Sequence, residues 1–253
     1  MTTISRVWAF AAFTLLEYGR SGRILIEVIT TIVLYYLLFR GSTTPMTAEA
    51  FFSLAGLLML AMAFYTTAMM LGLGDRAQGY LVLSRRLGRS GYLLGLYGAA
   101  VAVLFAAYGG LSLITALLNP IAQMDITAWL AGSLPLLLNV LMVAAAVTLL
   151  APMVLPARWR LALLCLVALA FSGSIVNSQA LRDMGPLLRN LLGTLQVLAS
   201  APLLPAFSGF ALAVTRDYSG AAVAVPLAQL SLTLGLLVMA IYAFGRREVI
   251  FQG

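Results

Sequence analysis

Side chains capable of chemistry are scarce in this chain of 253 residues, and the missing types exclude several functions. The sequence has no histidine, no lysine and one cysteine, Cys165, which lies in an apolar run. Histidine proton relays, Cys/His metal sites and internal disulfides therefore cannot form. A serine has no histidine or lysine base to activate it, and a Walker A motif requires a lysine. We expect no enzymatic activity and no catalytic, metal or cofactor site in this chain.

A few polar side chains lie within apolar stretches, where they could bind an ion or a substrate. Glu27 follows Arg23 by four residues, so an ion pair at the membrane edge would neutralise its carboxylate. A proton-coupling carboxylate is the alternative. Asn139 and Gln229 are the plainest polar residues near the midplanes of apolar segments. We interpret both as interhelical hydrogen-bonding residues, with a place on a substrate path as the alternative.

The composition predicts an all-α polytopic membrane protein. Hydrophobic residues make up 62% of the chain and charged residues 9%, against roughly 45–50% and 25% in soluble domains. The net charge of +7 comes from arginine alone. Nucleic acid would be the expected partner if the protein were soluble. Here the arginines cluster at the ends of apolar segments, where they set topology and contact anionic lipid. We therefore expect membrane lipid as a partner and no nucleic acid.

The longest polar break in the first half of the chain is basic. It contains Arg76, Arg85, Arg86 and Arg89, which by the positive-inside rule face the cytoplasm. Residues 76–90 also predict an amphipathic helix, with Arg85, Arg86 and Arg89 on one face and Tyr80, Leu83 and Leu87 on the other. We interpret this segment as a coupling helix that binds a cytosolic partner. Anchoring of the topology by its arginines is the alternative.

The remaining pattern predicts one transmembrane domain over residues 1–253. The six expected spans are 24–39, 50–73, 91–118, 128–155, 161–176 and 221–244. Residues 1–23 predict an interfacial helix with a polar cluster of Arg6, Glu17 and Arg20, and a ragged first span is the alternative.

The stretch 177–220 is too long for a hairpin loop and too apolar for an ordinary outer loop. We expect two short helices that form a re-entrant outer segment, because irregular backbone at membrane depth must be sheltered. A seventh span, the alternative, would leave the C-terminal arginines outside. Six spans instead place 11 of the 15 arginines and both termini in the cytoplasm. The chain is then expected in the inner (plasma) membrane.

Several local patterns accompany this layout. They are the interfacial helix Ile4–Arg20, the basic run LSRRLGRSGYLLGLY at Leu83–Tyr97, the proline pairs Ala201-Pro202 and Leu204-Pro205, and the ending Phe244-Gly245-Arg246-Arg247-Glu248. Together they resemble the permease subunit of a type-2 ABC exporter, whose third span begins with a similar "YLLGK"-like sequence. Leu96 stands here in place of that lysine.

The resemblance implies a dimer with a second permease copy or a paralogue, and two cytosolic ATP-binding subunits that hold ATP and magnesium. The implied function is export of an amphipathic, lipid-like or polymeric substrate. The implied ATPase-coupling residues are Tyr80, Val82, Arg85, Arg86 and Arg89. Two other function classes stay open: a non-transporting membrane scaffold or assembly factor, and an ion-coupled secondary carrier.

Overall fold

The computed structural model describes residues 3–40, 46–74, 87–119, 121–122, 124–170 and 186–246. Within these ranges the chain is helical, apart from short connections and one isolated β-bridge between Thr47 and Ala122. The helices are α1 (Thr3–Arg20), α2 (Ile24–Leu34, continued by a π-helical turn at Tyr35–Phe39), α3 (Ala48–Gly74), α5 (Gly88–Leu118), α6 (Ile126–Leu150), α7 (Ala157–Ala170), α10 (Pro186–Ser200), α11 (Leu204–Thr215) and α12 (Val225–Arg246).

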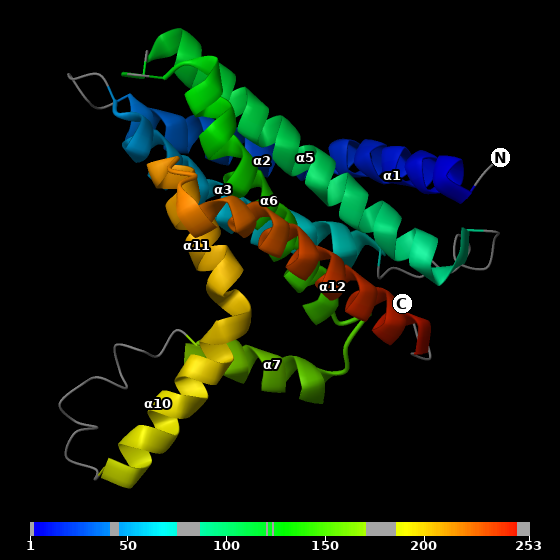
Figure 1. The fold of residues 1–253 in the computed structure, drawn as a ribbon. Coiled ribbons are helices and arrows are strands. Elements are labelled where there is room, and N and C mark those ends of the chain that lie inside the picture. The colour runs from blue at the N-terminus through cyan, green and yellow to red at the C-terminus, as the bar shows by residue number, and fades with distance from the viewer. Residues whose placement is uncertain are drawn as a thin grey trace.

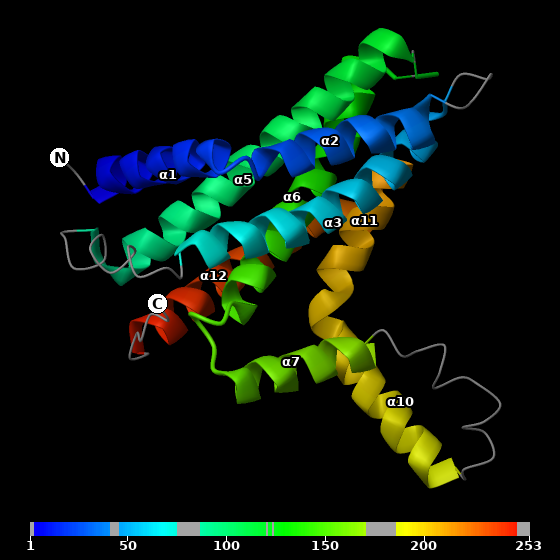
Figure 2. The same cartoon turned by 180° about the vertical axis from the view of Figure 1, so that it is seen from behind.

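Helices α3, α5, α6, α11 and α12 pack together as a bundle, and α1 and α2 lie along α5 (Figure 1). Helices α7 and α10 pack on each other away from this bundle in both views (Figures 1 and 2). We call one end of the bundle the proximal end. At this end α3 and α12 end, α5 begins, and α1 lies beside them. At the opposite, distal end α3 and α6 begin and α5 finishes.

Four predicted spans correspond to helices that are long and apolar enough to cross a membrane. These are Ala48–Gly74, Gly88–Leu118, Ile126–Leu150 and Gly220–Arg246. The membrane assignment and the all-helical class therefore agree with the structure. Helix α6 ends five residues before the predicted end of the fourth span. Ala151 precedes Pro152 and adopts an extended ψ of 143°, which stops the helix.

The other predicted spans differ from the structure. Residues 24–39 form α2 and its π-helical turn, which together are shorter than a spanning helix and reach that length only with α1, across a 71° bend. Helix α7 has 14 residues, and 171–176 of its predicted span lie outside the described residues.

The predicted re-entrant segment 177–220 contains the two expected helices, α10 and α11, but they are nearly continuous. Gly193–Thr215 is a stretch of 23 residues that is apolar enough to cross a membrane. The prolines do not end it, because Pro202 lies in a 3-10 turn and Pro205 in the first turn of α11, where a missing N–H is tolerated. The described residues thus hold five helices of spanning length, or six if α1 and α2 count as one.

A tyrosine hydroxyl replaces the backbone hydrogen bond that a proline removes from α6. Pro135 has no N–H, so the carbonyl of Ala131, four residues earlier, loses its helical donor. The Tyr218 hydroxyl, from the connection between α11 and α12, donates to that carbonyl at 2.7 Å. This bond ties the distal end of α6 to the turn that precedes α12.

We predict that Tyr218→Phe lowers the free energy of unfolding by about 1 kcal/mol, because the Ala131 carbonyl is left without a donor. In a Pro135→Ala background the restored N–H serves that carbonyl, so the same substitution should have a smaller effect. Denaturant unfolding of the four proteins in detergent gives the double-mutant cycle. An equal effect of Tyr218→Phe in both backgrounds would contradict this account.

Candidate functional site

The proximal end joins four helices through side chains of the first turns of α5. Gly74, the last residue of α3, accepts a hydrogen bond from the Tyr92 hydroxyl through its carbonyl at 2.5 Å. The Tyr92 ring stacks on Phe10 of α1, with ring centroids 4.9 Å apart. Tyr92 is buried, so α1, α3 and α5 meet around one side chain.

Arg89 adds α12 to this joint. Its guanidinium donates to the carbonyl of Gly245 at 2.9 Å and to that of Phe244 at 3.4 Å. These carbonyls belong to the last turn of α12, where a helix has no internal donors and its dipole favours a cation. We name this set the proximal joint, defined by Phe10, Gly74, Arg89, Tyr92 and Gly245.

Of the predicted coupling segment 76–90, only residues 87–90 lie within the described residues. Tyr80, Val82, Arg85 and Arg86 lie outside the described residues. Residues 88–90, predicted as the end of the coupling helix, belong to the first turn of α5, which begins three residues before the predicted third span. Arg89 is therefore a capping residue of α12 in this structure.

Helix α1 buries one side against the bundle and exposes large apolar side chains on another. Ala11, Thr14 and Tyr18 are buried against the bundle. Trp8, Phe13 and Leu16 are more than half exposed. Of the predicted polar cluster, Arg6 and Glu17 are partly buried and Arg20 is exposed. The exposed aromatic side gives α1 the surface of a helix that contacts lipid.

A glycine elbow turns the chain from α1 into α2. Gly22 has φ of +73°, a left-handed conformation that is open to glycine. The Ser21 hydroxyl donates to the carbonyl of Tyr18 at 2.8 Å as α1 ends. The chain bends by 71° between α1 and α2, and Tyr18 in the last turn of α1 donates a hydrogen bond to Glu27 in the first turn of α2.

Glu27 is buried rather than paired at a membrane edge. Its side chain is 3% exposed, and its Oε1 accepts hydrogen bonds from the Tyr18 hydroxyl and, at 3.0 Å, from the Thr66 hydroxyl. The predicted ion pair with Arg23 is wrong, since no such pair forms between these two described residues. The bend provides the physical reason, because it supplies Tyr18 as a neutral donor from α1. Oε2 has no hydrogen-bond partner among the described residues.

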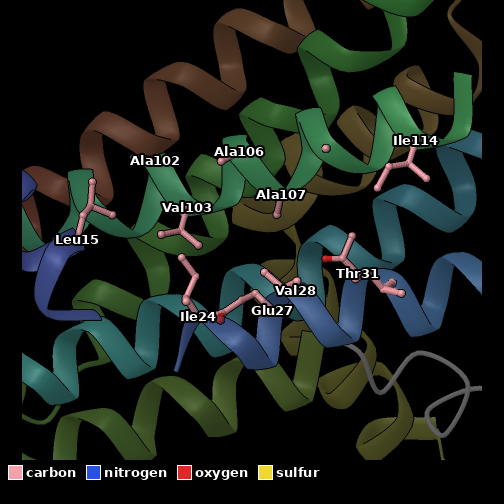
Figure 3. A pocket seen from close by; sticks show the side chains of 12 residues that line it. Leu15, Ile24, Glu27, Val28, Thr31, Ala102, Val103, Ala106, Ala107 and Ile114 are labelled. Atoms are coloured by element: carbon pink, nitrogen blue, oxygen red, sulfur yellow. The ribbon is translucent and has the colours of Figure 1, made fainter. Parts of the chain in front are cut away.

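A groove of about 450 Å³ runs beside Glu27 between α2 and α5 (Figure 3). Its walls extend from Ile24 to Ile32 on α2 and from Ala102 to Ile114 on α5. Leu15 of α1 lies at the same end of the groove as Ile24 and Glu27 (Figure 3). Glu27 and Thr31 are its polar lining residues, and the other lining residues are apolar.

The predicted interhelical residues Asn139 and Gln229 are hydrogen-bonded to each other. Gln229 Nε2 donates to Asn139 Oδ1 at 2.7 Å and to the Pro135 carbonyl at 3.0 Å. Asn139 Nδ2 donates to the carbonyl of Ala206 at 3.0 Å. The two amides thus connect α6, α11 and α12, which agrees with the packing interpretation.

Gly209 makes room for this amide pair. A Cβ at Gly209 would lie 1.9 Å from Gln229 Nε2 and 3.1 Å from Asn139 Oδ1. The glycine therefore allows α11 to approach the amides of the two neighbouring helices.

Sequence reasoning did not single out Tyr18, Thr66 or Tyr92. Tyr18 and Thr66 lie 9 and 39 residues from Glu27, so helical spacing gives no sign of their contact. A buried carboxylate needs donors, so a search of nearby apolar helices for hydroxyl side chains could have proposed them.

The chain has no match among known protein families, and no curated protein matches it.

We predict that Gly209→Ala lowers the free energy of unfolding by roughly 1–3 kcal/mol, because its methyl group displaces the Gln229 amide from Asn139. Gly235→Ala in α12 is the matched control, since a Cβ there meets nothing within 4 Å. Thermal unfolding in detergent measures both. Equal stability of the two variants would contradict the tight contact at Gly209.

Proposed function

We propose that the chain is the membrane subunit of an ATP-driven exporter, with both termini in the cytoplasm and separate ATP-binding subunits below it. The observation that carries this proposal is the proximal joint. Segment 75–86, which contains Arg85 and Arg86, connects the last residue of α3 to the start of α5 at that joint. A partner that binds this segment would act on both helices at once.

The contacts of the joint support transmission of such a force. Tyr92 is bonded to the end of α3 and stacked on α1, while Arg89 is bonded to the end of α12. A displacement of the first turns of α5 would therefore change the positions of three other helices. Rigid elements joined by hydrogen bonds and packed rings are suited to carry a movement of this kind.

The exposed apolar surface supports membrane lipid and a second permease copy as further partners. Large apolar side chains on α2 and α7 are well exposed, among them Ile29, Leu37, Trp159 and Leu161. In a bilayer this surface contacts acyl chains or another subunit. The apolar character of the helices favours an amphipathic or lipid-like substrate over a small polar solute.

One observation favours a second candidate, an ion-coupled secondary carrier. Glu27 is a buried carboxylate within a helix that packs in the membrane domain, and such residues mark ion or proton pathways in many transporters. This candidate requires no ATPase, and it predicts that Glu27→Gln abolishes ion-dependent flux.

We predict that Arg85→Glu/Arg86→Glu reduces capture of an ATP-binding subunit by about tenfold or more, because charge reversal turns attraction into repulsion. The tagged chain is purified in mild detergent from its own membranes, and the amount of a Walker-type ATPase and the ATP hydrolysis are measured. Arg89 is left intact because it caps α12.

The matched control is Arg158→Glu/Arg160→Glu, which reverses two other arginines, at the start of α7. It should retain the ATPase. A wild-type chain that captures no ATPase would refute the exporter, and flux that then depends on Glu27 would favour the carrier. Capture that survives Arg85→Glu/Arg86→Glu would refute this coupling segment.

A further inference from the structure

We propose that the groove between α2 and α5 binds a single-chain amphiphile that carries a primary ammonium group, with its nitrogen paired to Glu27. The inference deepens the proposed function, since the bound amphiphile would be the exported molecule. Three features of the described residues support it: the state of the carboxylate, the chemistry of the lining, and the shape of the groove.

Among the described residues, no ion pair forms at the carboxylate of Glu27. Both protein donors, Tyr18 and Thr66, reach the same oxygen, Oε1. The other oxygen, Oε2, is buried without a hydrogen-bond partner among the described residues. A buried carboxylate is strongly disfavoured unless a cation and hydrogen bonds compensate it. The site is thus complementary to a ligand that brings one positive charge and N–H donors.

The lining indicates what is attached to that charge. Beyond Glu27 and Thr31, the groove is lined by aliphatic side chains and by alanine and glycine. Such walls offer no hydrogen bonds to a polar chain, whereas a hydrocarbon chain is favoured there by apolar contact. A primary ammonium is a compact charge with three donors and suits an unpartnered carboxylate oxygen.

The shape indicates a single chain. The α5 wall from Ala102 to Ile114 is about 18 Å long at the rise of an α-helix. A volume of about 450 Å³ spread over that length makes the groove narrow. This volume lies in the range of known small-molecule sites. Glu27 lies nearer Leu15 than Ile114 along the groove, so the charge is expected toward the Leu15 end and the chain along α5 toward Ile114 (Figure 3).

The chain offers two pairs of matched variants. Glu27→Gln removes the charge and keeps the shape, and Glu49→Gln removes an exposed charge elsewhere. Gly110→Leu adds a side chain at a groove-lining position, and Gly109→Leu adds the same side chain at the neighbouring position outside the lining. A Cβ meets nothing within 4 Å at either glycine, so neither substitution begins with a clash next to the backbone.

The test is photolabelling of the purified full chain, without any ATPase, in phosphatidylcholine nanodiscs, a lipid without a primary amine. Three probes share a diazirine-bearing hexadecyl chain and end in an amine, an alcohol or a carboxylic acid. Peptide mass spectrometry then measures labelling on α2 and α5. We expect the amine to label these helices about tenfold more than the alcohol, as for a charge-assisted hydrogen bond.

Glu27→Gln should reduce amine labelling to the level of the alcohol, and Glu49→Gln should leave it unchanged. Gly110→Leu should reduce labelling by all three probes, and Gly109→Leu should not. Equal labelling of the wild type by the three probes, or an amine preference that survives Glu27→Gln, would overturn the proposal. Labelling that is present in the monomer but lost in a dimer would assign the groove to a second copy and would also overturn it.

The outcome is separate from that of the exporter proposal. Amine labelling that depends on Glu27, in a chain that captures no ATPase, would support the site and refute the exporter. Capture of an ATPase without any amine preference would do the reverse.

Discussion

The bundle depends on hydrogen bonds that side chains make to backbone or side-chain groups of neighbouring helices. In hydrocarbon, a polar group without a hydrogen-bond partner raises the free energy of the folded state, and charged side chains are rare there. Several tyrosine hydroxyls make such bonds. Among them, Tyr92 binds the Gly74 carbonyl, Tyr97 the Leu141 carbonyl at 3.1 Å, and Tyr108 the Ser133 hydroxyl at 2.6 Å. Each ring buries apolar area while its hydroxyl tip fixes the position of a neighbouring helix.

The same constraint explains why the two polar centres differ in chemistry. The centre between α6, α11 and α12 uses amides, which both donate and accept, so Asn139 and Gln229 bond to each other and to backbone carbonyls. The centre at Glu27 uses a carboxylate, which when ionised accepts hydrogen bonds only. The amide pair connects three helices, and Glu27 lines a groove. Among the described residues each centre also keeps one buried oxygen without a donor, Gln229 Oε1 and Glu27 Oε2.

Much of the fold follows from the sequence, because length and hydropathy determine which segments can cross a bilayer. The helices at Ala48–Gly74, Gly88–Leu118 and Ile126–Leu150 were predictable to within a few residues at most of their ends. The near-continuous course of α10 and α11 was not, because prolines usually mark breaks and here lie in first turns. An interhelical hydrogen-bonding role for Asn139 and Gln229 was predictable, since side-chain amides in apolar helices form hydrogen bonds between helices. The partners of Glu27 were not, because Tyr18 reaches it across the 71° bend near Gly22 and Thr66 reaches it through the packing of α3, and both are tertiary features.

The order of the Glu27 partners along the chain has a consequence for biosynthesis. Tyr18 precedes Glu27 by 9 residues, whereas Thr66 follows it by 39. When Glu27 leaves the ribosome, Tyr18 has therefore already emerged and Thr66 has not. The bend near Gly22 lets the nascent chain present a neutral donor to the carboxylate before α3 emerges. The first membrane segment thus carries one of its two hydrogen-bond donors into the bilayer, and the second arrives with the next helix.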